Sequence, residues 1–96
     1  MNVTIEFLGG LDALVEKQKE VKTTLPKEIT HLKHLIIWIK ENLMKSRQEE
    51  FVTNELQIRP GIMVLVNEID WALLDEENYE IQQNDRIAFL SSLHGG

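Results

Sequence analysis

The 96-residue sequence contains no cysteine, which excludes disulfide bonds, cysteine-ligated zinc sites and thiol nucleophiles. Positive charge is scarce as well: ten Lys and Arg residues stand against sixteen Asp and Glu residues. Proteins that bind nucleic acid directly normally present a basic surface to the phosphates, so we expect no direct nucleic-acid binding. An acidic surface either favours basic protein partners or serves solubility alone.

Long apolar runs are also absent. No run exceeds the five residues from Ile62 to Val66, far fewer than a bilayer-spanning helix needs, so we expect no membrane association. The first apolar stretch alternates with polar residues and has no basic leader, so a signal peptide is not expected. We therefore expect a cytoplasmic protein, with the nucleus as an alternative location.

The first third of the chain has the pattern of a hairpin. Apolar and polar side chains alternate over residues 3–7, which predicts a strand with one buried face that ends at Gly9-Gly10. A short helical turn is expected at residues 11–14 and a weaker strand at residues 19–25. The two strands would form a hairpin with a long connection.

One amphipathic helix is predicted over residues 30–45, with Thr30 capping its first turn. Trp38 would project from the side away from the apolar stripe, over His34. The apolar residues at helical spacing are Leu32, Leu35, Ile36, Ile39 and Leu43.

The second half of the chain reads as strands separated by polar turns. Strands are predicted at residues 62–66, from about Trp71, and at residues 86–90, with Asn84 in a left-handed turn before the last. Strands on both sides of a single helix indicate one α+β domain, residues 1–90, with the helix across one face of the sheet. The expected core is Val3, Ile5, Phe7, Leu32, Leu35, Ile36, Ile39, Leu43, Ile87 and Phe89.

The run at residues 62–66 is apolar at every position, although a strand with one wet face should alternate. Part of it must be exposed or covered. We expect an apolar patch that docks a partner and includes Leu90 and Ala88 of the last strand, with Leu93 nearby. The alternative is burial under the loop around Tyr79.

Conventional catalytic and ligand sites are not evident. His31 and His34 lie near each other on the helix, but a metal needs three or four converging ligands, and we expect a solvated helix face and no metal. Gly9-Gly10 lacks the further glycines and the lysine of a phosphate-binding loop. The carboxylates at residues 68–77 fit turns and loops. We expect that the chain is not an enzyme.

Residues 91–96, Ser-Ser-Leu-His-Gly-Gly, are predicted to form a flexible tail. Two glycines let an extended chain enter a narrow channel and leave the terminal carbonyl open to attack. A carboxylate reacts with nucleophiles only after one oxygen becomes a leaving group, and transfer of AMP from ATP supplies one. The sequence therefore predicts that the Gly96 carboxylate reacts in the active site of a partner enzyme. The alternative is an ordinary frayed terminus.

Four segments together resemble the eukaryotic ubiquitin-related modifier family, the sulfur-carrier relatives of ubiquitin, over nearly the whole chain. They are Leu8-Gly9-Gly10-Leu11-Asp12, Ile58-Arg59-Pro60-Gly61-Ile62, Val66-Asn67-Glu68-Ile69-Asp70-Trp71 and Leu93-His94-Gly95-Gly96. The resemblance implies a β-grasp fold: a mixed sheet of four to five strands, with the first and last adjacent at its centre and one main helix across one face.

The resemblance also implies a function. In this family a ubiquitin-activating-like enzyme with a rhodanese domain adenylates the terminal glycine, here Gly96, using ATP and magnesium. Persulfide sulfur converts it to a thiocarboxylate, which the tRNA thiolation machinery uses on wobble uridines. The activated terminus can also be joined to lysines of target proteins by an isopeptide bond. No cofactor is expected on the chain itself. The expected tail-recognition residues are Gly95, His94 and Leu93, although His94 has the alternative of being an exposed residue without a role.

Two other classes compete with this interpretation. A prokaryotic-type sulfur carrier, such as the small subunit of molybdopterin synthase, is generally shorter and tends to lack the Leu-His-Gly-Gly ending. A binding-only ubiquitin-like module would never activate its terminus, and it has no reason to end on a free Gly-Gly.

Overall fold

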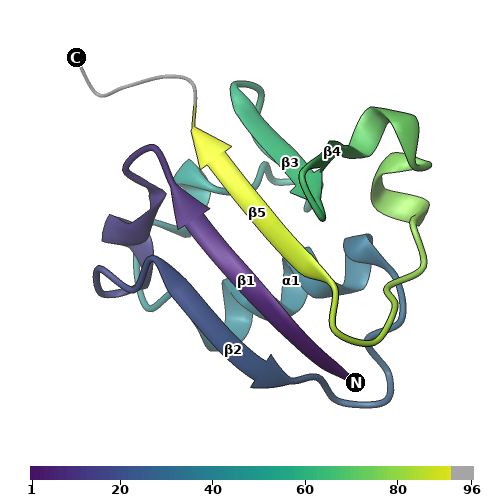
Figure 1. Cartoon of the computed structure of the whole chain (residues 1–96). Coiled ribbons are helices and arrows are strands. Elements are labelled where there is room, and N and C mark those ends of the chain that lie inside the picture. Colours follow the sequence, from purple (N-terminus) through teal and green to yellow (C-terminus); the bar gives the residue numbers. More distant parts are fainter. Residues whose placement is uncertain (92–96) are drawn as a thin grey trace.

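The first and last strands of the chain lie side by side and parallel at the centre of a five-stranded sheet (Figure 1). The computed structural model describes residues 1–91. The strand order is β2-β1-β5-β3-β4, and the three neighbouring pairs other than β1–β5 are antiparallel. The strands are β1 (Asn2–Leu8), β2 (Glu20–Thr24), β3 (Ile62–Val66), β4 (Ile69–Asp70) and β5 (Arg86–Ser91). The central pairing expected from the family resemblance is confirmed.

One α-helix, α1 (Leu32–Asn42), packs across one face of this sheet, called here the helix face (Figure 1). The opposite face is called the outer face. Short 3-10 helices make the connections: η1 (Leu11–Val15), η2 (Gln48–Glu50), η3 (Trp71–Leu73) and η4 (Glu76–Asn78). Among residues 1–91, no helix is both long and apolar enough to cross a membrane.

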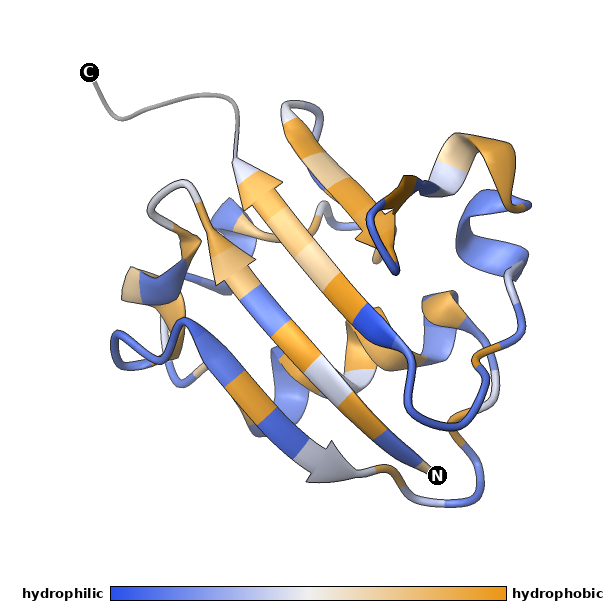
Figure 2. Cartoon of the chain, viewed as in Figure 1, coloured by the Kyte–Doolittle hydropathy of each residue, from blue (hydrophilic) through white to orange (hydrophobic). Residues whose placement is uncertain are grey.

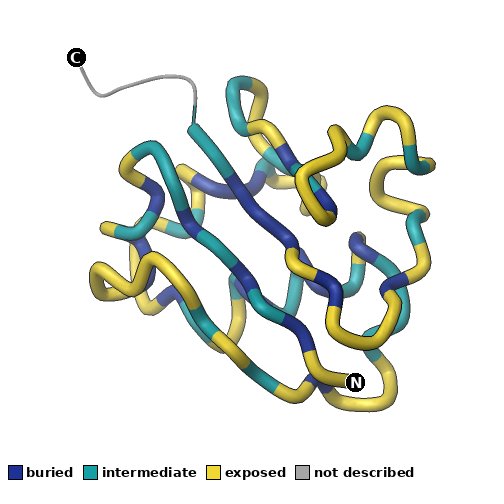
Figure 3. The backbone as a smooth tube through the Cα atoms, viewed as in Figure 1, coloured by how far each residue is buried: buried dark blue, intermediate teal, exposed yellow. Residues whose placement is uncertain are grey.

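Strand register places the alternating apolar residues together on the helix face. Ile5 pairs with Ile87, and Phe7 pairs with Phe89, which also pairs with Val64 of β3. All five side chains are completely buried, as expected for four of them, and the tube in Figure 3 shows the alternation along β1. Such a core, in which each apolar side chain leaves water, is the main stabilising term of a small domain.

Three aromatic rings form the centre of this core. The ring centroids of Phe7 and Phe89 lie 6.0 Å apart, and Phe51 meets Phe89 edge-on at 5.2 Å and Phe7 at 6.5 Å. Phe51 comes from the connection between α1 and β3, directly after η2, and it is not among the residues that the sequence analysis expected in the core. Buried Phe51 therefore anchors that connection to the sheet.

The helix is shorter than predicted at both ends. It begins after His31, whose side chain makes no capping bond, and Thr30 does not cap it. The Thr30 hydroxyl lies instead 2.7 Å from Nδ1 of His31, so the predicted cap is wrong because that side chain has another partner. At the other end, Gln48 Nε2 donates to the carbonyl oxygens of Lys40 (2.9 Å) and Met44 (3.0 Å), so an amide from the next segment satisfies groups of the last turn.

The predicted apolar stripe packs on the sheet with one exception. Leu32, Leu35, Ile36 and Ile39 are at most 2% exposed. Leu43 is only partly buried because it lies beyond the last helical residue. Trp38, expected to project from the other side, is instead half-buried and packs against the core.

The short strand after β3 lies two residues earlier than predicted. β4 is Ile69–Asp70, and Trp71 already begins η3. The Asp70 carboxylate accepts a hydrogen bond from the Ala72 amide at 2.9 Å, which caps η3 and ends the strand. The left-handed conformation predicted for Asn84 is confirmed, with φ of 68°.

Asp85 ties the last turn to the rest of the domain. Its carboxylate is 5% exposed and accepts hydrogen bonds from the Tyr79 hydroxyl (2.7 Å), the Asn67 amide (2.9 Å) and the Gln82 backbone amide (2.8 Å). Burial, together with the hydrogen bond to Asp85, raises the pKa of Tyr79 to about 12. A buried carboxylate with three donors is fully paired, so this cluster holds the chain that leads into β5.

Candidate functional site at the end of β5

The outer face carries an apolar surface beside the end of β5. Leu90 pairs with Leu8 of β1 on one side and with Met63 of β3 on the other, and Leu65 lies two residues further along β3, on the same face. Met63 is 42% exposed, while Leu8, Leu65 and Leu90 are half-buried. Figure 2 shows that the ends of β1, β5 and β3 next to Ser91 are mostly apolar. We call Leu8, Met63, Leu65 and Leu90 the tail patch.

The prediction that part of the run at residues 62–66 is exposed is confirmed by Met63. The alternative, burial under the loop around Tyr79, is wrong. The Tyr79 carbonyl accepts a hydrogen bond from the Leu32 amide at the start of α1, which places that loop on the helix side. The outer face beside β5 is therefore not covered by that loop.

Ala88 lies on the same face but is only 6% exposed. Its neighbours across the sheet are Glu6 on β1 and Leu65 on β3, whose longer side chains stand on either side of its methyl group. Ala88 therefore forms the floor beside the tail patch and offers little contact area. Sequence reasoning named Leu90 but missed Leu8 and Met63, because only the strand register shows that they are its neighbours.

The turn after β1 packs tightly on the last described residue. Gly9 has φ of +64°, and a Cβ at this position would collide with the Ser91 carbonyl oxygen and lie 2.9 Å from Leu90 Cδ1. Only glycine therefore lets this turn approach so closely. Gly9 fixes the position of Ser91, after which residues 92–96 follow. The sequence marked Gly9 as a strand end and a family motif, but it gave no sign of this contact.

A cleft of about 510 Å³ lies beside this contact, lined by the Gly9-Gly10 turn, Ser91, and the segment Arg59-Pro60-Gly61. Arg59 Nε donates to the Glu49 carbonyl oxygen at 2.6 Å, which holds the segment in place before β3. Two motif segments that are far apart in the sequence thus meet at the end of β5. The fourth motif begins two residues after Ser91.

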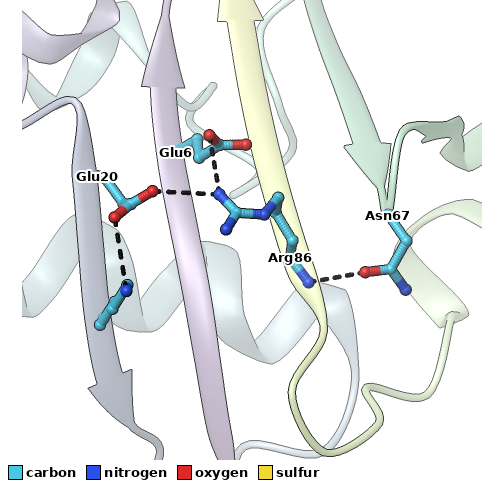
Figure 4. Close-up of polar contacts among 5 residues, drawn as sticks. Glu6, Glu20, Asn67 and Arg86 are labelled. Carbon is cyan, nitrogen blue, oxygen red and sulfur yellow. Dashed lines mark hydrogen bonds and ion pairs between the residues drawn. The ribbon is translucent and has the colours of Figure 1, made fainter.

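Charged side chains occupy the other half of the outer face (Figure 4). Arg86 Nη1 lies 3.0 Å from Glu6 Oε2 and 3.2 Å from Glu20 Oε2, while the Arg86 amide donates to Asn67 Oδ1 at 2.9 Å. The hydrogen bond to Glu20 and the charge of Glu6 raise the pKa of Arg86. Two carboxylates share one guanidinium, so this half forms a charged border to the apolar half.

Residues 1–91 contain no cluster of three or more His, Asp or Glu side chains suited to a metal ion. The rings of His31 and His34 lie edge-on, with centroids 5.6 Å apart, and the Thr30 hydroxyl lies 2.7 Å and 3.4 Å from their Nδ1 atoms. The remaining predicted site residues, Leu93, His94, Gly95 and Gly96, lie outside the described residues.

Comparison with known proteins agrees with this architecture. A family model described as Urm1 (Ubiquitin related modifier) matches residues 2–96. Ubiquitin-related modifier 1 of Coccidioides immitis is 45% identical over 101 residues, covering 100% of this chain and 88% of that protein. The human protein of the same name is 44% identical over 98 residues, covering 100% of this chain and 96% of that one. The solution structure of Urm1 from Trypanosoma brucei has a TM-score of 0.83 and 34% identity, covering 99% of this chain and 95% of that one.

The sheet order, the single helix and this superposition define a ubiquitin-like protein with the β-grasp fold. The family match is more specific: the chain belongs to the ubiquitin-related modifier family. It is thus a ubiquitin-like modifier related to sulfur carriers. The resemblance carried by the four motif segments is confirmed.

Proposed function

We propose that this chain is a sulfur carrier and protein modifier whose reacting group is the carboxylate of Gly96. The observation that carries the proposal is the convergence of Gly9, Arg59 and the tail patch on Ser91 at the end of β5. The family model, which extends to residue 96, supports placing the reaction beyond that point. A rigid domain would thus present a short segment to a partner enzyme.

The chemistry follows from the inertness of a carboxylate. A Gly96 oxygen attacks the α-phosphorus of ATP, pyrophosphate leaves, and the carbonyl becomes an acyl adenylate. The terminal sulfur of a persulfide on the partner then attacks the carbonyl, a C–S bond forms and AMP leaves with the bonding electrons, which gives an acyl disulfide. A thiol of the partner attacks the partner's own sulfur in that S–S bond, which forms a disulfide on the partner and releases the thiocarboxylate. Attack by a lysine amine on the activated carbonyl gives an isopeptide bond instead.

In this proposal the activating partner, a ubiquitin-activating-like enzyme with a rhodanese domain, supplies ATP, magnesium and the catalytic groups. The chain itself is not an enzyme and binds no cofactor. Leu93, His94 and Gly95 contact the channel through which Gly96 reaches the active site. The sulfur passes to the tRNA thiolation machinery for wobble uridines, in the cytoplasm and also in the nucleus.

The tail patch is proposed to dock the activating enzyme. Among residues 1–91, Met63 offers the most exposed apolar side chain of the outer face, and Leu90 and then Leu8 follow it towards β1. Apolar side chains that become fully buried at the centre of an interface usually dominate binding energy. The charged border of Glu6, Glu20 and Arg86 would fix the orientation, since charge complementarity contributes mainly specificity and association rate.

Intact mass spectrometry tests the reaction. After incubation with a cognate activating enzyme, ATP and a sulfur donor, the mass should show exchange of one oxygen for sulfur, localised to the C-terminal peptide. Deletion of Gly96 should abolish loading and conjugation and leave the melting temperature unchanged. Gly95→Ala should slow loading, because a Cβ obstructs the channel. The carrier proposal fails if an active partner system leaves Gly96 unmodified and the protein still supports its pathway. The chain would then act as a binding-only module.

A matched pair of variants tests the docking surface. Met63→Glu introduces a charge at the tail patch, and Leu73→Glu introduces one at a leucine of η3 that is 78% exposed. Met63→Glu should raise the KM for adenylation at least 10-fold, which corresponds to about 1.4 kcal/mol of lost binding. Leu73→Glu should leave it unchanged. Equal kinetics for both variants would remove the tail patch from the mechanism.

A further inference from the structure

A second concave surface lies on the helix side of the molecule, away from the tail patch. It is a groove of about 530 Å³ between α1 and the segment at residues 55–58, with Trp71 also in its wall. Its charged and polar lining is Lys33, His34, Glu55, Gln57 and Glu77. Its apolar lining is Ile36, Ile37, Leu56, Ile58 and Trp71. We call this surface the helix-side groove.

Leu56 is held in the groove wall in an uncommon conformation. Its side chain is 41% exposed, and its φ of 62° is left-handed, which is unfavourable for a residue with a Cβ. Strained backbone of this kind persists only where surrounding structure enforces it, and it concentrates at binding and catalytic sites. Here the left-handed residue presents an apolar side chain at the surface.

The turn that carries Leu56 is well defined. The Leu56 amide donates to the Thr53 carbonyl oxygen at 3.0 Å, and the Thr53 amide donates to the Gln57 carbonyl oxygen at 2.8 Å. The Gln57 amide also donates to Thr53 Oγ1 at 3.3 Å, and Val52 and Ile58 form a bridge at its base. The groove wall is thus fixed before any partner arrives, which lowers the entropy lost on binding.

Two carboxylates, Glu55 and Glu77, and one lysine, Lys33, line the groove, and acidic residues prevail in the chain segment that contains Trp71 and Glu77. Between Arg59 and Arg86 the sequence contains no Lys, Arg or His, while the exposed residues there include Glu68, Asp70, Asp75, Glu76, Glu77 and Glu80. Within the described part of the chain, none of these carboxylates forms an ion pair with a basic side chain. Lys33, the basic residue of the lining, contacts the Asn78 side chain at 3.4 Å. An occupant that complements this surface is cationic with an apolar face.

We propose that the helix-side groove docks a short cationic amphipathic helix of a partner protein. Apolar side chains of such a helix, spaced one turn apart, would contact Ile37, Leu56 and Trp71, a known mode of helix recognition. Its lysines or arginines would face Glu55 and Glu77. Because α1 and the tail patch lie on opposite faces of the sheet, the groove binds its partner whether or not the tail patch is occupied.

A fluorescein-labelled 14-residue peptide of leucine and lysine, with leucines on one helical face, provides the probe. We expect binding by anisotropy with a Kd on the order of 10–100 μM, typical of a small, transient interface. A matched peptide with glutamate at every lysine position should bind at least 10-fold more weakly. In amide NMR spectra, shifts caused by the lysine peptide should centre on Ile37, Leu56 and Trp71.

Variants separate this proposal from the tail chemistry. Leu56→Gly should weaken peptide binding at least 5-fold without lowering the melting temperature, because glycine relieves the left-handed strain. Glu77→Lys should weaken binding about 3-fold. Met63→Glu and deletion of Gly96 should leave binding unchanged, although both should impair loading by the activating enzyme.

Three results would overturn the proposal: no binding of the lysine peptide at 1 mM, equal binding of the glutamate peptide, or shifts centred on Leu8, Met63 and Leu90. The first means that the groove is not a helix-docking surface. The second means that the charge of the groove does not discriminate between cationic and anionic peptides. The third means that the peptide binds the tail patch instead of the groove.

Discussion

Replacement of Gly9 by alanine should destabilise the domain more than the same replacement at Gly10, although both glycines are left-handed. Gly9 has φ of +64° and Gly10 has φ of +94°, so each alanine incurs a conformational penalty of about 1–2 kcal/mol. The surroundings differ. Among residues 1–91, a Cβ on Gly10 meets no atom within 4 Å, whereas a Cβ on Gly9 collides with the Ser91 carbonyl oxygen.

The collision adds to the penalty because its partner is backbone in the central strand and cannot move to another rotamer. Overpacking of this kind typically costs about 1–3 kcal/mol. We therefore expect Gly10→Ala to lower the free energy of unfolding by about 1–2 kcal/mol and Gly9→Ala by about 2–5 kcal/mol. For a domain of this size, each kcal/mol corresponds to about 4–8 °C in melting temperature.

Urea denaturation of both variants, with a common m-value, measures the difference directly. Loading kinetics, measured below both melting temperatures, should fall further for Gly9→Ala, because relief of the collision displaces Ser91 and everything after it. If the two variants lose the same stability to within about 0.5 kcal/mol, the close approach of Gly9 to Ser91 does not exist in solution. The proposed role of this turn in fixing the tail would then fail with it.

Three further predictions concern the core, the buried carboxylate and alkaline pH. Phe89→Ala should lower the free energy of unfolding, measured in urea, by about 3–5 kcal/mol. Leu73→Ala, at a residue that is 78% exposed, should change it by less than about 0.5 kcal/mol. Similar losses for the two variants would contradict the assignment of Phe89 to the core. Asp85→Ala should lower the free energy of unfolding by about 2–4 kcal/mol, because three hydrogen-bond donors lose a buried acceptor. A loss below about 1 kcal/mol would mean that water replaces the carboxylate as their acceptor. The pKa of Tyr79 is raised to about 12, so its proton is held more tightly in the folded state, and this stabilisation is complete below pH 10 and lost as the pH rises through about 12. Unfolding free energies of the wild type and Tyr79→Phe should therefore converge over that range by on the order of 1 kcal/mol after solvent screening, and parallel pH profiles would refute the assignment.

The strands and the core follow from local pattern, which is why sequence alone locates them. Alternation at Val3, Ile5 and Phe7 requires one buried face, and all three are at most 3% exposed. The helical spacing of the apolar residues on α1 likewise requires one buried face. These patterns depend only on which residues avoid water, and burial of apolar surface decides the fold at this level.

The features that sequence reasoning missed depend on contacts between distant segments. Thr30 fits a helix cap, but its hydroxyl lies 2.7 Å from Nδ1 of His31, and the helix begins at Leu32. Trp71 favours a strand, but the Asp70 side chain caps a 3-10 turn at that position. Met63 joins Leu90 only through the antiparallel register of β3 and β5. No periodicity within a single segment carries that information.

The position of β5 determines how the domain responds to a mechanical load on its C-terminal end. A partner that grips the chain beyond Ser91 pulls along the axis of a strand bonded to β1 on one side and to β3 on the other. The force then acts in shear on both ladders, so their hydrogen bonds bear the load together and cannot be peeled apart one at a time. Whatever unfolds this domain by pulling on the end of β5 must therefore break two ladders at once.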